Sequence, residues 1–209
     1  MTEKTPAYGG GKGLEIILQK QISSGDTCNT TQWRLPNHIG SHVDAPKHFD
    51  DDGVTIDQYE PGEWIFNKPY IIDVMVKDAE IIGVEHLERS DITVHDVDLF
   101  IIRTGFEQFR NDRRYREEQP AYHPDIAQYL GRRFPSFSSI GMDTISISSI
   151  QHKELGREAH HAFLDKGYRV FEDLHLKDIP VGKLKKVIAL PIRVLKGDGA
   201  PCTLIGWFE

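Results

Sequence analysis

The 209-residue chain carries 25 lysine and arginine residues against 32 aspartate and glutamate residues, a net charge of −7 at pH 7. This acidic balance argues against nucleic acid or an anionic membrane as a partner. No apolar run approaches the roughly 20 residues that span a bilayer, and the glycine-rich stretch 1–13 is unlike a signal peptide. Only two cysteines occur, so a disulfide framework is excluded. We expect a soluble, cytoplasmic protein with a single domain over residues 1–209.

Predicted strands outnumber predicted helices along the chain. The strand candidates are 14–22, 32–35, 69–76, 99–103, 139–142, 169–171, 187–194 and 203–208. The helix candidates are 84–88, 124–132 and 151–166, and Gly167 after the last of these is a usual helix stop. Because the two kinds of element are interspersed, we expect an α/β fold in which a sizeable mixed sheet is packed by a few helices.

The stretch 9–13, Gly-Gly-Gly-Lys-Gly, has the composition of a phosphate-binding loop. Such a loop needs a helix that begins directly after its glycines. The residues that follow, 14–22, predict a strand instead. We therefore interpret this stretch as a flexible loop.

Three histidines and one aspartate lie close together in the segment 38–48, at His38, His42, Asp44 and His48. Prolines and a glycine in and beside the segment oppose a helix. In an extended chain His42 and Asp44 point the same way, with about 7 Å between their Cα atoms. A turn at Gly40 would bring His38 to the same point, and His48 could reach it from the other side. The segment is therefore a candidate metal site.

The types of side chain narrow the choice of metal. Imidazole and carboxylate ligands together suit Zn²⁺ or Mn²⁺, and also Fe²⁺. No cysteine lies nearby, which argues against a closed structural zinc site. Three local ligands and an open position are typical of a catalytic metal. The alternative is a histidine-rich loop with ordinary hydrogen-bonding roles.

The segment 38–48 resembles the His-x-Gly-Thr-His-x-Asp-x-Pro-x-His signature of the metal-dependent cyclase family, with Ser41 in place of threonine. That family includes bacterial kynurenine formamidases (arylformamidases) and isatin hydrolases. Segment 2–8 resembles its N-terminal loop, 140–146 its central strand and loop, and 160–174 its closing His-x(11)-Glu-x-Leu element. The resemblance covers nearly the whole chain. It implies a swivelling β/α/β-type mixed sheet and a homodimer or higher homo-oligomer.

The resemblance also implies a centre with one or two divalent metals, Zn²⁺ or Mn²⁺. The positions that match one metal are His38, His42 and Asp44. Asp44 is expected to bridge to a second metal, which His160 and Glu172 hold. The family spacing favours His160 over its neighbour in the sequence.

The position that matches the catalytic acid/base of the family is His48. Other members have aromatic residues near the active site, so Trp33, Phe49 and Trp64 are candidates for substrate binding. Core packing is the alternative role for these aromatic residues. The N-terminal loop has Ala-Tyr-Gly-Gly at 7–10, where kynurenine formamidases tend to carry Trp-Pro-Gly-Asp.

By resemblance, the expected activity is metal-dependent hydrolysis of a C–N bond in a small amide or cyclic amide, as in arylformamidases. A metal-bound hydroxide would attack the carbonyl, and His48 would transfer the proton. One alternative is lactone hydrolysis, or a cyclisation or dehydration, at the same metal. Another is a catalytically silent protein that binds a small molecule. This last alternative predicts that His48 or a ligand is lost, and all of them are present.

Overall fold

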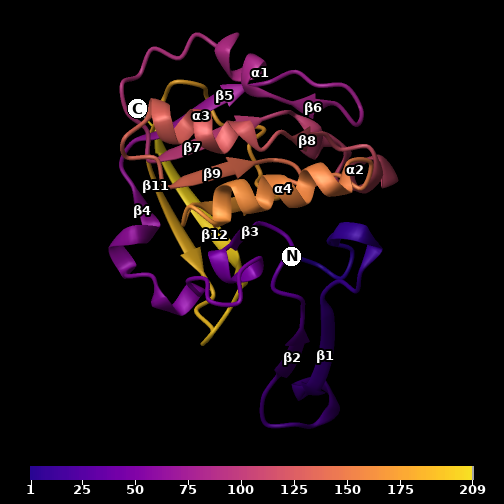
Figure 1. The fold of residues 1–209 in the computed structure, drawn as a ribbon. Coiled ribbons are helices and arrows are strands. Elements are labelled where there is room, and N and C mark those ends of the chain that lie inside the picture. Colours follow the sequence, from indigo (N-terminus) through magenta and orange to yellow (C-terminus); the bar gives the residue numbers. More distant parts are fainter. Residues whose placement is uncertain (209) are drawn as a thin grey trace.

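The computed structural model describes residues 1–208 and centres on one eight-stranded mixed sheet (Figure 1). The strand order is β4-β11-β12-β3-β10-β9-β7-β5. Its strands are β3 (His42–Asp44), β4 (Ile65–Phe66), β5 (Pro69–Asp73), β7 (Leu99–Arg103), β9 (Ser139–Met142), β10 (Arg169–Glu172), β11 (Leu184–Pro191) and β12 (Gly199–Phe208). Neighbours from β5 to β10 pair in parallel, and those from β10 to β4 pair antiparallel. The expected α/β fold is confirmed.

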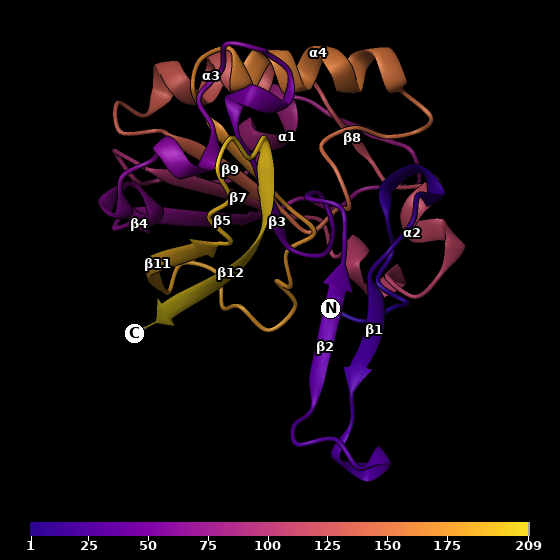
Figure 2. The ribbon, with the colours of Figure 1, turned by 90° about the horizontal axis from the view of Figure 1, so that it is seen from below.

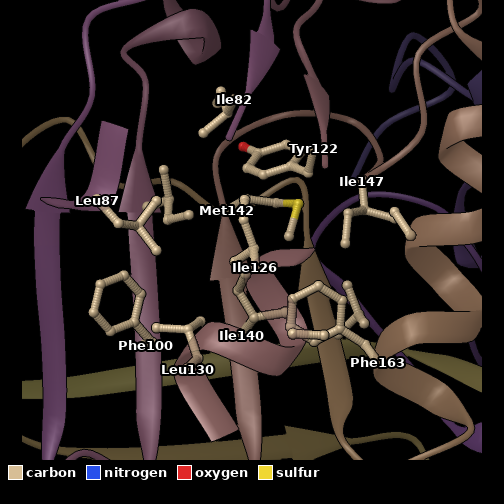
Figure 3. Packing of buried hydrophobic residues seen from close by; sticks show 14 of the residues in the cluster. Ile82, Leu87, Phe100, Tyr122, Ile126, Leu130, Ile140, Met142, Ile147 and Phe163 are labelled. Carbon is tan, nitrogen blue, oxygen red and sulfur yellow. The ribbon is translucent and has the colours of Figure 1, made fainter. Parts of the chain in front are cut away.

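Helices cover one face of this sheet (Figure 2). They are α1 (Val84–Glu88), α3 (Asp125–Arg133) and α4 (Lys153–Leu164), while the short α2 (Arg113–Glu117) lies toward one end. Phe100 and Ile140 of the parallel strands pack against Leu130 of α3 and Phe163 of α4 in a fully buried cluster (Figure 3). Parallel strands are usually covered on both faces, which is why β7 and β9 are almost uniformly apolar.

A second apolar cluster packs against the other face of the sheet and includes residues of β11 and β12. Val43 of β3 and Phe171 of β10 point into this second cluster. Successive side chains of a strand point to opposite faces. The neighbours of these two residues, His42, Asp44 and Glu172, therefore face α4, and this alternation positions the site described below.

The strands predicted near the N-terminus form a separate hairpin, β1 (Glu15–Lys20) and β2 (Thr30–Arg34). The hairpin extends away from the main sheet (Figures 1 and 2). Ile16 pairs with Trp33 and Leu18 with Thr31, so these side chains share one face of the hairpin. Ile16, Leu18 and Trp33 are all exposed. A two-stranded hairpin of this kind is only marginally stable by itself.

Most predicted elements agree with the structure to within a few residues. The predicted helix 84–88 coincides with α1, and strands 99–103 and 139–142 coincide with β7 and β9. Strand 69–76 is too long, and β12 begins four residues before its predicted start at 203. The short β4, the pair β6 (Ile81–Ile82) and β8 (Ala121–Tyr122), and α2 were not predicted. Within residues 1–208, no helix is both long enough and apolar enough to cross a membrane.

Candidate metal centre

Three elements bring four ionisable side chains to one buried point. β3 supplies His42 and Asp44, and its antiparallel neighbour β10 supplies Glu172, which pairs directly with His42. Helix α4 supplies His160 from the layer above. None of the four is more than 4% exposed. Such burial of ionisable groups is stable only when they are paired or bind a metal.

Two loops add a histidine each at the edge of this cluster. Gly40 has a φ of 63°, and the turn there brings Nδ1 of His38 to 2.6 Å from Oδ1 of Asp44. His48 ends the short 3₁₀ helix Pro46–His48. The His48 ring stacks on the His38 ring with 4.0 Å between centroids. The turn expected at Gly40 is therefore present, and both loop histidines reach the cluster.

Asp44 lies at the centre of the cluster. Nε2 of His42 is 3.1 Å from Oε2 of Glu172 and 3.6 Å from Oδ1 of Asp44. Nε2 of His160 is 3.7 Å from both Oδ2 of Asp44 and Oε1 of Glu172. The ligand atoms of His42, Asp44 and Glu172 thus lie within reach of one cation, and Nε2 of His160 faces the same two carboxylates from the other side.

Backbone carbonyls fix the orientation of two of these imidazoles. Nδ1 of His42 donates to the carbonyl oxygen of Gly40 at 2.7 Å, and Nδ1 of His160 donates to that of Gly156 at 2.8 Å. A carbonyl can only accept, so the proton is on Nδ1 in both rings. The Nε2 lone pairs are left facing the carboxylates, which is how metal-binding histidines are commonly held.

The opposite charges of His38 and Asp44 shift each other's pKa. Burial alone would lower the pKa of His38, but its hydrogen bonds to Asp198 and Asp44 outweigh burial and raise the pKa to about 10. Burial alone would raise the pKa of Asp44, but the hydrogen bond from His38 and the charges of the histidines hold it well below its usual range. His38 is therefore protonated beside the anionic Asp44 and Asp198, and a cation bound at Nδ1 of His38 would displace its proton.

The donor set and its unpartnered atoms fit a divalent metal. Nε2 of His42, although 3.1 Å from Oε2 of Glu172, and Oδ2 of Asp44 are both buried without a hydrogen-bond partner. Buried polar atoms without partners are rare and costly. Among the described residues, two groups have ligand atoms within 4.8 Å of one another: His38, Asp44 and His48, and His42, Asp44 and Glu172. Nitrogen and oxygen donors without sulfur suit Zn²⁺ or Mn²⁺.

Four of the five predicted ligands fall in these two groups, and the fifth, His160, lies 3.7 Å from Asp44 and from Glu172. Asp44 belongs to both groups, as expected of a bridging carboxylate. His42 groups with Glu172, whereas the resemblance implies a first metal on His38, His42 and Asp44. His48, the predicted acid/base, groups with His38 at the outer edge.

The three aromatic candidates lie in different places. Phe49 stacks on the ring of His160 with 4.5 Å between centroids and so borders the cluster. Trp64 ends a 3₁₀ helix and is buried in the second apolar cluster, where it packs edge-on against Phe171. Trp33 is 67% exposed on the hairpin. Within this chain, the structure brings only Phe49 of the three to the cluster.

Asp198, in the turn before β12, was not predicted to be at the site. Its Oδ2 atom lies 2.9 Å from Nε2 of His38 and 3.2 Å from Nδ1 of His48. Hydrogen bonds from these two histidines hold the pKa of Asp198 well below its usual range. The only local signal is a Gly-Asp-Gly turn before a strand, which does not by itself indicate contact with a histidine.

Tyr8 of the N-terminal loop also lies close to the cluster. Burial and the negative charge of Glu172 raise the pKa of Tyr8, and a hydrogen bond with Ser148 opposes that rise. Ser148 in turn lies 3.2 Å from Nδ1 of His160. The phenol of Tyr8 therefore lies near Ser148 and Glu172, at a residue that is 37% exposed.

A cavity of about 1010 Å³ lies on the opposite face. Ser41 and Asp173 line it, and these are the sequence neighbours of His42 and Glu172. The five residues of the two candidate metal-binding groups do not line this cavity, and His160 does not line it either. Strand alternation therefore separates it from the metal cluster.

Comparison with known proteins gives consistent results. The family model described as "Putative cyclase" matches residues 1–149. The kynurenine formamidase of Bacillus cereus (strain ATCC 10987 / NRS 248) is 31% identical over 187 residues, which cover 90% of this chain and 83% of that protein. The kynurenine formamidase of Geobacillus thermodenitrificans is 26% identical over 201 residues, which cover 96% of this chain and 90% of that protein.

Solved structures share the fold. An isatin hydrolase bound to the product analogue thioisatinate has a TM-score of 0.82 and 19% identity, covering 98% of this chain and 87% of that chain. Isatin hydrolase A from Ralstonia solanacearum has a TM-score of 0.82 and 16% identity, covering 100% of this chain and 89% of that chain. Because the family model matches residues 1–149 and a relative 31% identical is covered over most of its length, this chain belongs to the cyclase family.

Proposed function

We propose that this protein is a metal-dependent hydrolase that cleaves the C–N bond of a small amide or cyclic amide, and that aryl formamides are its first substrate class to test. The observation that carries the proposal is the buried cluster centred on Asp44, with histidine nitrogens and the Glu172 carboxylate facing it. The kynurenine formamidases among its relatives support the substrate class.

A divalent cation at this cluster would supply Lewis acidity, which polarises a carbonyl and makes water more acidic. The residues that would hold it are His38, His42, Asp44, His160 and Glu172. Asp44 and Glu172 contribute the negative charge, and the hydrogen bonds to Gly40 and Gly156 keep two imidazoles in the tautomer that binds.

His48 is the proposed acid/base. Its Nδ1 atom contacts Asp198, so Nε2 is the atom that exchanges a proton with the reacting groups. A proton passed from Nε2 of His48 to the departing nitrogen lets that nitrogen leave as an amine, which is a much better leaving group than an amide anion. Phe49, which packs edge-on against His48 and stacks on His160, covers this side of the site with an apolar ring.

The metal, compartment and assembly are part of the same proposal. The nitrogen and oxygen donor set favours Zn²⁺ or Mn²⁺, one or two ions per chain. A cytoplasmic location fits two unpaired cysteines, exposed Cys28 and buried Cys202. We expect residues 1–209 to act as one catalytic domain within a homodimer or higher homo-oligomer. The exposed apolar face of the hairpin, with Ile16, Leu18 and Trp33, supports a contact between subunits.

The test is an activity screen on metal-free protein reloaded separately with Zn²⁺ and Mn²⁺. The substrates are N-formyl arylamines, isatin-like cyclic amides and small lactones. Metal-dependent hydrolysis of either amide class supports the proposal, and Asp44→Ala should abolish it. Turnover of lactones alone would favour the lactonase alternative. Tight binding of these compounds without turnover, in protein shown to hold metal, would favour a silent binding protein.

A further inference from the structure

Asp198 makes a contact that links the two loop histidines. Its Oδ2 atom accepts from both Nε2 of His38 and Nδ1 of His48, at 2.9 and 3.2 Å. Its Oδ1 atom accepts from Nδ2 of Asn37 at 2.6 Å. Both carboxylate oxygens are therefore engaged, and one of them joins a candidate metal ligand to the candidate acid/base.

The backbone holds Asp198 in this place. The carbonyl oxygen of Asp198 accepts from the amide of Ala45 at 2.9 Å, directly after β3. Gly199, which follows, pairs with Asp44 across β3 and β12. A Cβ atom on Gly199 would overlap Cε1 of His38. The turn before β12 is thus packed against the His38 ring, which fixes the distance between carboxylate and imidazole.

His38 differs from the other two imidazoles of the cluster in its outer partner. Carbonyls hold Nδ1 of His42 and of His160, whereas the carboxylate of Asp198 holds Nε2 of His38. In each ring the opposite nitrogen faces Asp44 or Glu172. A carboxylate partner both selects the tautomer and makes the imidazole a stronger donor to a metal.

We propose that Asp198 is a positioning residue with two effects, keeping Nδ1 of His38 available to a divalent metal and holding His48 stacked against His38. The inference rests on the proposed function and extends it to a residue far from the signature segment. Partners of this kind typically contribute a factor of about 10 to 100 in metal affinity or activity.

The test compares Asp198→Ala and Asp198→Asn with Asp57→Ala. Oδ1 of Asp57 accepts from the amide of Lys196 at 2.7 Å, so this control loosens the same loop without touching a histidine. Zn²⁺ and Mn²⁺ affinities are measured by chelator competition on metal-free protein, and circular dichroism checks folding. We expect Asp198→Ala to weaken metal binding about 10- to 100-fold. Asp198→Asn should be intermediate because it keeps an acceptor oxygen, and Asp57→Ala should stay within about threefold of wild type.

Kinetics at saturating metal test the second effect. Loss of Asp198 should lower kcat about 10-fold or more with little change in KM, because His48 is misplaced after the substrate is bound. An active, metal-binding wild type whose Asp198→Ala and Asp198→Asn variants keep its affinity and kcat would overturn the role of Asp198 alone. Equal losses in Asp57→Ala would reduce the effect to loop order and also overturn it. A wild type that binds no metal would overturn the proposed function as well.

Discussion

His42 and Glu172 face each other directly across the antiparallel pair β3 and β10, with 3.1 Å between Nε2 and Oε2. On the other side of β3, His42 pairs with Pro201 of β12. The central strand of the site is therefore fixed on both edges by long-range pairing. Because His42 and Glu172 share one rung of the sheet, a shift of one residue would turn either side chain to the opposite face.

The first prediction concerns the metal content of the wild type and of Asp44→Ala. Wild-type protein should contain one or two divalent ions per chain after loading and desalting. Asp44→Ala should lose most of them, because Asp44 belongs to both groups of ligands. Elemental analysis measures this directly. Asp51→Ala, which removes an exposed carboxylate, should keep the wild-type content. Equal metal contents in the two variants would contradict the bridging role.

The second prediction separates metal binding from proton transfer. His48→Gln should keep nearly all of the metal but lower kcat about 10² to 10⁴-fold, the usual contribution of a general acid/base. The loss should be smallest for substrates with good leaving groups, which need little protonation as they depart. His42→Gln should lose both metal and activity. If His48→Gln loses as much metal as His42→Gln, His48 is a ligand, which its place beside His38 and Asp44 also permits.

The third prediction concerns the glycine next to Asp198. Gly199→Ala places a Cβ atom against Cε1 of His38 and 2.8 Å from the carbonyl oxygen of Val43. Since β3 cannot yield without breaking its pairing, we expect the His38 ring to be displaced and metal affinity to fall. Gly62→Ala is the matched control, because a Cβ atom there meets nothing within 4 Å. Isothermal titration with Zn²⁺ measures both, and unchanged affinity in Gly199→Ala would show that His38 does not need its present position.

The fourth prediction uses the two cysteines. Burial raises the pKa of Cys202 to about 12, so its thiol stays protonated and unreactive well above neutral pH. In a Cys28→Ser background, iodoacetamide at pH 8 should leave the folded protein unlabelled. The same protein should take up one label in denaturant, where the thiol recovers an ordinary pKa. Intact-mass spectrometry counts the labels, and rapid labelling of the folded chain would mean that the β11–β12 pair opens readily.

The fifth prediction concerns assembly. Light scattering should report at least twice the 23.8 kDa chain mass at micromolar concentration. The double variant Leu18→Asp, Trp33→Ser should shift the protein toward monomer, because both side chains lie on the apolar face of the hairpin. Gln32→Ala changes the opposite face and should leave the mass unchanged. A wild-type monomer at this concentration would contradict the homo-oligomer.

Local sequence pattern was sufficient for much of the fold and of the candidate site. Apolar runs located β7 and β9, and a proline before α3 and Gly167 after α4 marked helix ends. The spacing from His38 to His48 indicated a metal cluster, since residues so near in sequence need only one turn to meet. These features depend on neighbouring residues, whose geometry the backbone and its preferred turns determine.

Only the tertiary structure decided which residues from distant parts of the sequence contact that cluster. Asp198 reaches His38 because β12 pairs with β3, and no local pattern specifies which strands pair. Trp64 and Trp33 look equally suited to a substrate site in sequence, yet one is packed in the core under β10 and the other is exposed on the hairpin. Side-chain chemistry and spacing thus determined what kind of centre this chain forms. The register of long-range strand pairs, which is selected by the burial of two apolar clusters, decided what surrounds it.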